Sequence, residues 1–294
     1  KVSTIYKYKY FSIIVLIVPI LIAINIYKDF GISIDEESTR YHGLVSLNYV
    51  IEFFGLHFEP FKNIKSLETY EYREYGVLFE ILSAILENIF KINSYQDIFY
   101  FRHLYVHIIF FISIIFFYRI ILNLFDNLYL ALAGSTILYT TPRIFAHSFY
   151  NSKDIIFLSL FIISIYFFCK FFKNRSLSNI VYLGLSLALL TSVRSIGFYC
   201  LIVLFLFMFA EILDKKVELK EIIKLILYIS IAYFLFLYLF WPFLWEDPIK
   251  NFLYALKSFS DYGWGGQVFY FGKFYEPNSL PWHYIPVWIL GTIS

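Results

Sequence analysis

The stretch that decides the fold is residues 103–122, which read HLYVHIIFFISIIFFYRIIL and contain one charged side chain, Arg119. A bilayer core about 30 Å thick is crossed by roughly 20 apolar residues in a helix. The sequence therefore predicts a membrane-spanning helix at this position.

The rest of the chain has the same apolar character. Of its 294 residues, 60% are hydrophobic, 23% are aromatic and only 16% are charged, and the mean hydropathy is +0.68. A soluble domain has too little interior for that much apolar surface, whereas a bilayer can accommodate it. The net charge of +2 gives no indication of a nucleic-acid partner. Cys169 and Cys200 both fall in apolar runs and are expected to be buried thiols.

About eight segments are apolar enough to span, and several are short, as tilted or partial spans would be. They are residues 10–28, 103–122, 127–141, 155–172, 179–193, 196–213, 221–241 and 284 to the end. The expected fold is an all-α integral membrane protein that forms a single module over 1–294. Because the chain starts at Lys1 and stops at Ser294 inside an apolar segment, we expect a C-terminal part to be missing.

The basic residues between the spans predict the orientation. If the spans alternate, three basic clusters fall on one face, which the excess of Lys and Arg in cytoplasmic loops marks as cytoplasmic. These clusters are Lys1, Lys7 and Lys9; Lys170, Lys173 and Arg175; and Lys215, Lys216, Lys220 and Lys224. The opposite face then holds the external loops 29–102, 142–154 and 242–283 and a turn at Arg194.

The external loops contain helical patterns of their own. TRYHGLVSLNYVIEFFGL (39–56) and YGVLFEILSAILENIF (75–90) have apolar residues at helical spacing. Both predict amphipathic helices that lie at the membrane interface. Asp247 followed by Pro248 predicts the start of a third short helix, with a capping carboxylate and then proline at the first helical position.

Three acids, DEE at 35–37, follow the first span, and Arg40 and Tyr41 come directly after them. A carboxylate at the membrane surface can act as a general base. The alternative is structural, because Ser33 and Glu36 have the spacing of a capping box and acids favour a helix N-terminus.

The segment PRIFAHSFYNSKD (142–154) leads directly into a span. Asn151 or Ser152 could cap the following helix, with Asp154 in its first turn. Alternatively the free N–H groups of that helix bind an anion, and Arg143 and Lys153 add positive charge. A phosphate at the level of the lipid headgroups would suit such a site.

Two further features have both a functional and a structural interpretation. Arg194 lies between two apolar runs, where a charge is usually functional or paired but can also reach the surface. In DYGWGGQVFYFGKFYEPNSLPWHY (261–284), Tyr262 could stack on a sugar and Lys273 and His283 could make polar contacts, or the aromatics could form an interfacial belt.

His103 and His107 have the spacing of a metal-binding pair, but no acidic third ligand is near them in the sequence, which favours a packed histidine pair. The chain also has no HExxH, Walker, GxSxG or CxxC motif, which argues against the common soluble hydrolase and nucleotide chemistries.

Taken together, DEESTRYHG (35–43), PRIFAHSFYNSKD (142–154) and GGQVFYFGKFYEPNSLPWHYIPVW (265–288) resemble the bacterial GT-C glycosyltransferases of family 39. Within them the chain looks most like the branch of protein O-mannosyltransferases and lipid A aminoarabinose transferases. The resemblance covers nearly the whole chain. It implies a transmembrane helix module with juxtamembrane helices in the first external loop, located in the bacterial inner membrane with its active face noncytoplasmic.

The resemblance also implies a reaction. A sugar moves with inversion from a polyprenyl-phosphate donor to a hydroxyl of a lipid, glycan or protein acceptor. Asp35 carries over as the base, Glu36 as its assistant and Asp154 as a second acidic position. Arg143, Lys153 and Arg194 are the cations available to the leaving phosphate. Candidate substrate contacts are Arg40, Tyr41, His147, Asn151, Tyr262, Lys273 and His283.

No cofactor is implied with certainty. The chain has no DxD motif that we can assign to a metal, so a divalent ion stays an option and no metal ligand is predicted. Two alternatives to a transferase are open. A transporter or flippase for a lipid-linked or anionic substrate would need charged or broken helices near the midplane. A noncatalytic scaffold would use its loop charges only as caps and interface anchors.

Overall fold

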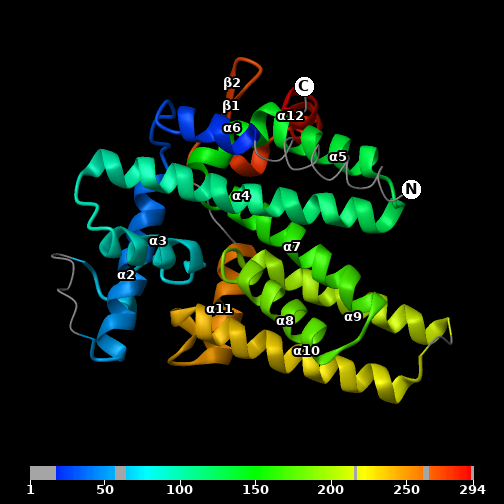
Figure 1. Cartoon of the computed structure of the whole chain (residues 1–294). Coiled ribbons are helices and arrows are strands. Elements are labelled where there is room, and N and C mark those ends of the chain that lie inside the picture. The colour runs from blue at the N-terminus through cyan, green and yellow to red at the C-terminus, as the bar shows by residue number, and fades with distance from the viewer. Residues whose placement is uncertain (1–17, 57–63, 215–216, 261–264, 293–294) are drawn as a thin grey trace. The chain divides into compact units, whose positions relative to one another are not determined.

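The computed structural model describes residues 18–56, 64–214, 217–260 and 265–292 (Figure 1). They fall into two compact units, Lys1–Ala255 and Leu256–Ser294, and each unit is described by itself.

The first unit is helical. Residues 18–26 form the described part of its first helix. The longer elements that follow are α2 (Glu36–Phe53), α3 (Leu78–Ile89), α4 (Tyr95–Phe125), α5 (Leu128–Thr140), α6 (Pro142–Tyr150), α7 (Asp154–Lys173), α8 (Leu177–Thr191), α9 (Phe198–Leu213), α10 (Leu219–Phe240) and α11 (Pro248–Ser260), whose last residues, from Leu256 on, belong to the second unit. Three 3₁₀ turns lie between them, η1 (Leu67–Thr69), η2 (Ser195–Gly197) and η3 (Pro242–Leu244).

Among the described residues, four helical stretches are long and apolar enough to cross a membrane: Tyr95–Phe125, Asp154–Lys173, Ser195–Leu213 and Leu219–Phe240. α5 and α8 are apolar but shorter. These helices agree with an all-α, multi-pass membrane protein, whereas the expected total of about eight spans stays a prediction. The first expected span lies partly outside the described residues.

The apolar helices pack in a series in which α4 contacts α7, α7 contacts α8, and α8 contacts α10 (Figure 1). Gly184 makes the last contact close, since a Cβ there would lie 2.7 Å from the Cβ of Ala232. Leu183, Leu187 and Ile229 are buried in the same core. Its buried Tyr233 donates a hydrogen bond to Thr191 Oγ1 at 3.0 Å, which satisfies the phenol.

Side-chain contacts show which helix ends lie together. At one end, Lys173 Nζ donates to the carbonyl of Asn123 at 3.2 Å, and Arg175 pairs with Glu211 at 2.5 Å. At the other end of α7, Asp154 pairs with Arg194. Because α7 has 20 residues, the two ends are about 30 Å apart. The basic cluster at 170–175 and the turn at Arg194 therefore lie at opposite ends, as alternating spans predict.

α2 and α3 lie at the Arg194 end, and Figure 1 shows α2 running across the direction of α4. The N–H of Leu78 donates to the carbonyl of Ser192 at 3.3 Å. Gly43 allows α2 to approach α3, because a Cβ on it would be 2.5 Å from the Cβ of Glu80. The two helices expected in the first external loop are thus present, with slightly different bounds.

The Asp247–Pro248 helix start is confirmed: α11 begins at Pro248, and Lys250 N–H donates to Asp247 Oδ1 at 3.2 Å. The second unit contains the antiparallel strands β1 (Val268–Tyr270) and β2 (Lys273–Tyr275), then η4 (Pro277–Ser279) and α12 (Tyr284–Thr292). Phe271 and Gly272 both have positive φ, 46° and 79°, as a two-residue hairpin turn requires. This hairpin is a departure from the purely helical expectation.

Candidate functional site

A cavity of about 140 Å³, which we call the α7 cavity, lies where α7 begins. It is bordered by the start of α2, the junction of α6 and α7, and the turn after α8. The predicted site residues that line it are Asp35, Glu36, His147, Asn151, Lys153, Asp154 and Arg194. The structure therefore brings together residues from three segments that are far apart in the sequence.

Two adjacent acids at this cavity have opposite surroundings. Glu36 is 5% exposed, accepts from the N–H of Ser33 at 2.6 Å and lies 3.0 Å from His103 Nε2. It thus forms one half of the expected capping box. Asp35 precedes α2 without a side-chain cap bond, and no described residue donates a hydrogen bond to its carboxylate.

Asp154 and Arg194 form an ion pair at 2.5 Å on the rim of the cavity, where both side chains are largely exposed. Asn151 holds Asp154 in place, since its Oδ1 accepts from the Asp154 N–H at 2.8 Å and its Nδ2 donates to Asp154 Oδ2 at 3.0 Å. Asn151 therefore accepts a hydrogen bond from the first N–H of α7, which is the capping role considered for it. The same Nδ2 also donates to His147 Nδ1 at 2.9 Å.

Lys153 is half-buried, with its Nζ 4.6 Å from the centroid of the Tyr75 ring. Burial lowers the pKa of Lys153, and Arg194 lowers it further, while Asp35, Glu80 and Asp154 act in the opposite direction. The ammonium is therefore only partly solvated, and its charge depends on the carboxylates around it.

The pKa of His147 is also lowered, by burial first and by Arg143 second, and Asp154 partly offsets this. His147 is consequently favoured as a neutral ring that can accept or donate a hydrogen bond at the cavity.

A buried charged network lies behind the cavity, and the sequence analysis missed it. Ser152 Oγ donates to Glu80 Oε1 at 2.6 Å. Arg102 pairs with both Glu80 and Glu87, the latter at 2.6 Å, and Arg40 pairs with Glu87 at 2.9 Å. A signal was present in the sequence: Glu80 and Glu87 are seven residues apart, on one face of an otherwise apolar helix, and Arg102 begins the longest apolar run.

Some predicted site residues lie elsewhere. Arg40 is held by Glu87, and Tyr41 accepts from the N–H of Lys65 at 3.2 Å, so neither lines the α7 cavity. Arg143 is exposed in the first turn of α6 and does not line it either.

The remaining candidates belong to the second unit or lie outside the residues that the structure describes. Lys273 is exposed in β2, and His283 Nδ1 is 2.8 Å from the hydroxyl of Tyr270, within that same unit. Tyr262 lies outside the described residues.

His103 and His107 contact different groups. His103 bonds Glu36, whereas His107 Nδ1 is 2.9 Å from Ser148 Oγ and its Nε2 is 3.2 Å from the hydroxyl of Tyr139. This agrees with a packed histidine pair. The described residues contain no cluster of three or more metal-ligating side chains.

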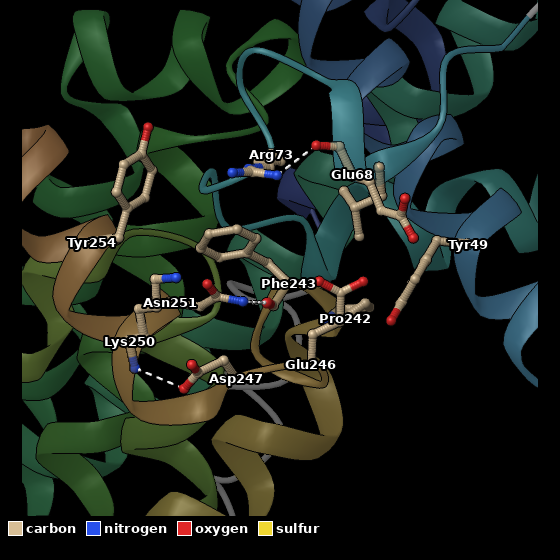
Figure 2. Close-up of a pocket in the computed structure, with 11 residues that line it drawn as sticks. Tyr49, Glu68, Arg73, Pro242, Phe243, Glu246, Asp247, Lys250, Asn251 and Tyr254 are labelled. Carbon is tan, nitrogen blue, oxygen red and sulfur yellow. Dashed lines mark hydrogen bonds between the residues drawn. The ribbon is translucent and has the colours of Figure 1, made fainter.

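A second cavity, of about 230 Å³, lies where α11 begins (Figure 2), and we call it the α11 cavity. Its floor is formed by the buried side chains of Leu67, Pro242 and Phe243. Asn251 Nδ2 donates to the carbonyl of Phe243 at 2.7 Å and so ties α11 to η3.

No family model, curated protein or solved structure matches this chain. The geometry of the two cavities is therefore the basis for assigning a function.

Proposed function

We propose that the chain is a membrane glycosyltransferase that moves a sugar from a polyprenyl-phosphate donor to a hydroxyl acceptor at the α7 cavity. The observation that carries this proposal is the division among the three carboxylates that line the cavity. Glu36 is engaged by His103 and Ser33, and Asp154 by Arg194 and Asn151. Asp35 alone among them makes no side-chain hydrogen bond or ion pair within the described structure, although its charge acts on the nearby Lys153.

Asp35 is the proposed general base. The bond between the sugar C1 and the phosphate oxygen breaks, and the phosphate keeps the electron pair. The acceptor oxygen bonds to C1 from the opposite face, which inverts the centre, and its proton passes to Asp35. A carboxylate can take this proton because the hydroxyl becomes acidic as it bonds to an electron-poor carbon.

Lys153 and Arg194 are the proposed partners of the phosphate. A lipid phosphate leaves as an anion, so it needs positive charge rather than a proton donor. The guanidinium of Arg194 has N–H groups beyond the one that pairs with Asp154, and it stays charged at physiological pH. Asp154 then has a positioning role, because it fixes the direction of Arg194.

The location of the cavity supports a lipid donor. It lies at the ends of apolar helices and at the start of α7, the end opposite to the basic cluster at 170–175. If that cluster is cytoplasmic, as its charge favours, the reaction takes place on the noncytoplasmic side of the membrane.

The test is sugar transfer in membranes, with radiolabelled polyprenyl-phosphate sugars and chains expressed at equal levels. Asp35→Asn keeps the size of the side chain but is not a base, so transfer should fall at least about 100-fold. Glu37→Gln is the matched control, since Glu37 is an exposed acid beside the cavity that does not line it.

Equal transfer by wild type and Asp35→Asn would overturn the assignment of the base. If the wild type carries donors across the bilayer and transfers sugar from none of them, a transporter is the better description.

A further inference from the structure

We infer that the α11 cavity binds a single sugar ring through its hydroxyl groups, at a site separate from the α7 cavity. This inference does not rest on the proposed transfer reaction, because binding can be measured without it.

Three of the residues that line the cavity carry hydrogen-bond acceptors. Glu68 comes from η1, Glu246 from the turn after η3, and Tyr49 from α2, and all three line the cavity. Figure 2 shows Tyr49 and Glu68 on the side of the cavity away from Lys250 and Tyr254. No described residue donates a hydrogen bond to the carboxylate of Glu68 or Glu246.

Both carboxylates act on the Tyr49 phenol. Burial raises the pKa of the Tyr49 phenol, and the charges of Glu246 and Glu68 raise it further. The phenol therefore keeps its proton and can donate or accept a hydrogen bond at the cavity.

Three other residues of the cavity carry hydrogen-bond donors. Arg73 uses one N–H to reach the carbonyl of Glu68 at 2.5 Å, and a guanidinium has five. No described residue accepts a hydrogen bond from Lys250 Nζ or from the hydroxyl of Tyr254. Unused donors and unused acceptors therefore face the same cavity.

The mixture of donors and acceptors indicates the chemical class of the ligand. A free phosphate would be repelled by Glu68 and Glu246, and a simple ammonium would be repelled by Arg73 and Lys250. A hydroxyl group both donates and accepts, so a ring that carries several hydroxyls can satisfy both sets.

The size of the cavity fits one ring. The guanidinium carbon of Arg73 lies 5.8 Å from the centroid of Phe243, so the cation packs on this ring at the cavity (Figure 2). A volume of about 230 Å³ lies below the range of drug-sized pockets, about 300–1,000 Å³, so it suits one ring rather than an oligosaccharide.

The α11 cavity lies too far from Asp35 for one sugar to contact both. Tyr49 follows Asp35 by 14 residues (49 − 35) along α2, which is about 21 Å at 1.5 Å per residue. One sugar ring cannot reach both, so the α11 cavity would hold a different sugar unit from any at Asp35.

The test uses the full chain in lipid nanodiscs and saturation-transfer NMR with the methyl glycosides of glucose, galactose and mannose. We expect at least one to bind the wild type, and Glu246→Gln to weaken it about tenfold, because the acceptor of the hydrogen bond is no longer charged. Glu71→Gln is the control, an exposed acid of the same loop that does not line the cavity. Tyr254→Phe, which removes one exposed hydroxyl, provides a second variant if Glu246→Gln does not fold.

Three results would overturn the inference. They are no binding of any glycoside by the wild type, equal binding by the wild type and both cavity variants, and binding of inorganic phosphate in place of the glycosides.

Discussion

The charged groups behind the α7 cavity differ from two that line it, Asp35 and Lys153. Glu80, Glu87 and Arg102 are almost completely buried, and each has a charged partner. Asp35 makes no side-chain hydrogen bond or ion pair in the described structure, and Lys153 packs its ammonium over a tyrosine ring. The difference shows which charges hold the fold and which are free for a ligand, since a buried charge is tolerated only when it is paired.

The buried network also explains how the cavity is assembled. Glu80 from α3 contacts Ser152 at the start of α7 and Arg102 in α4, while Glu36 from α2 contacts His103 in α4. These contacts attach α2 and α3 to the ends of the apolar helices α4 and α7. The chain therefore uses paired charges to position the unpaired Asp35.

The largest expected effect is the loss of the arginine at the centre of this network. Arg102→Gln leaves Glu80 buried without a cation and Glu87 with Arg40 alone, which should cost about 3–5 kcal/mol. The thermal unfolding midpoint in detergent measures this. Arg119→Gln is the control on the same helix, because Arg119 is exposed. If both variants unfold at the same temperature, the network does not hold the fold.

The next effect tests the close approach of α2 and α3. Gly43→Ala places a Cβ 2.5 Å from the Cβ of Glu80, so the helices must separate, at a cost of about 1–3 kcal/mol. Gly31→Ala is the control, since a Cβ on Gly31 meets no atom within 4 Å. Thermal midpoints of both variants decide the question, and an unchanged midpoint for Gly43→Ala would contradict the packing.

A smaller effect concerns pH. Burial, and secondly Lys153, lower the pKa of His42 from 6.5 to about 4. Between pH 6.5 and about pH 4, the His42 ring is protonated in the unfolded chain and neutral in the folded chain. Stability is therefore complete above pH 6.5 and is lost as the pH falls toward 4.

By pH 5 the loss should be on the order of 1–2 kcal/mol. The measurement compares thermal midpoints at pH 7 and pH 5 for the wild type and His42→Gln, and the variant should lose less. An equal loss in both would show that His42 does not control this dependence.

The position of the α7 cavity could be predicted from the sequence because helix ends are readable. Alternating apolar runs place residues 35–37, 151–154 and Arg194 at the same end, whatever the details of packing. Caps and loop charges mark where each helix begins.

Contacts between helices could not be predicted in this way. The pairing of Arg40 with Glu87 depends on how α2 and α3 are rotated against each other, and hydropathy does not fix that rotation. Arg143 was expected near Lys153, but α6 places it eight residues, or about 12 Å, before Asn151. The β-hairpin at 268–275 was also missed, because its aromatic residues are equally typical of an interfacial belt.

The most direct test of the account compares two adjacent acids, Asp35 and Glu36, in one pair of measurements. Thermal stability and sugar transfer should be measured on Asp35→Asn and Glu36→Gln side by side. We predict that Asp35→Asn keeps the wild-type midpoint and loses transfer, whereas Glu36→Gln lowers the midpoint, because Glu36 is buried against His103. If Asp35→Asn lowers the midpoint as much as Glu36→Gln and leaves transfer per folded molecule unchanged, Asp35 is a structural residue and the central claim is wrong.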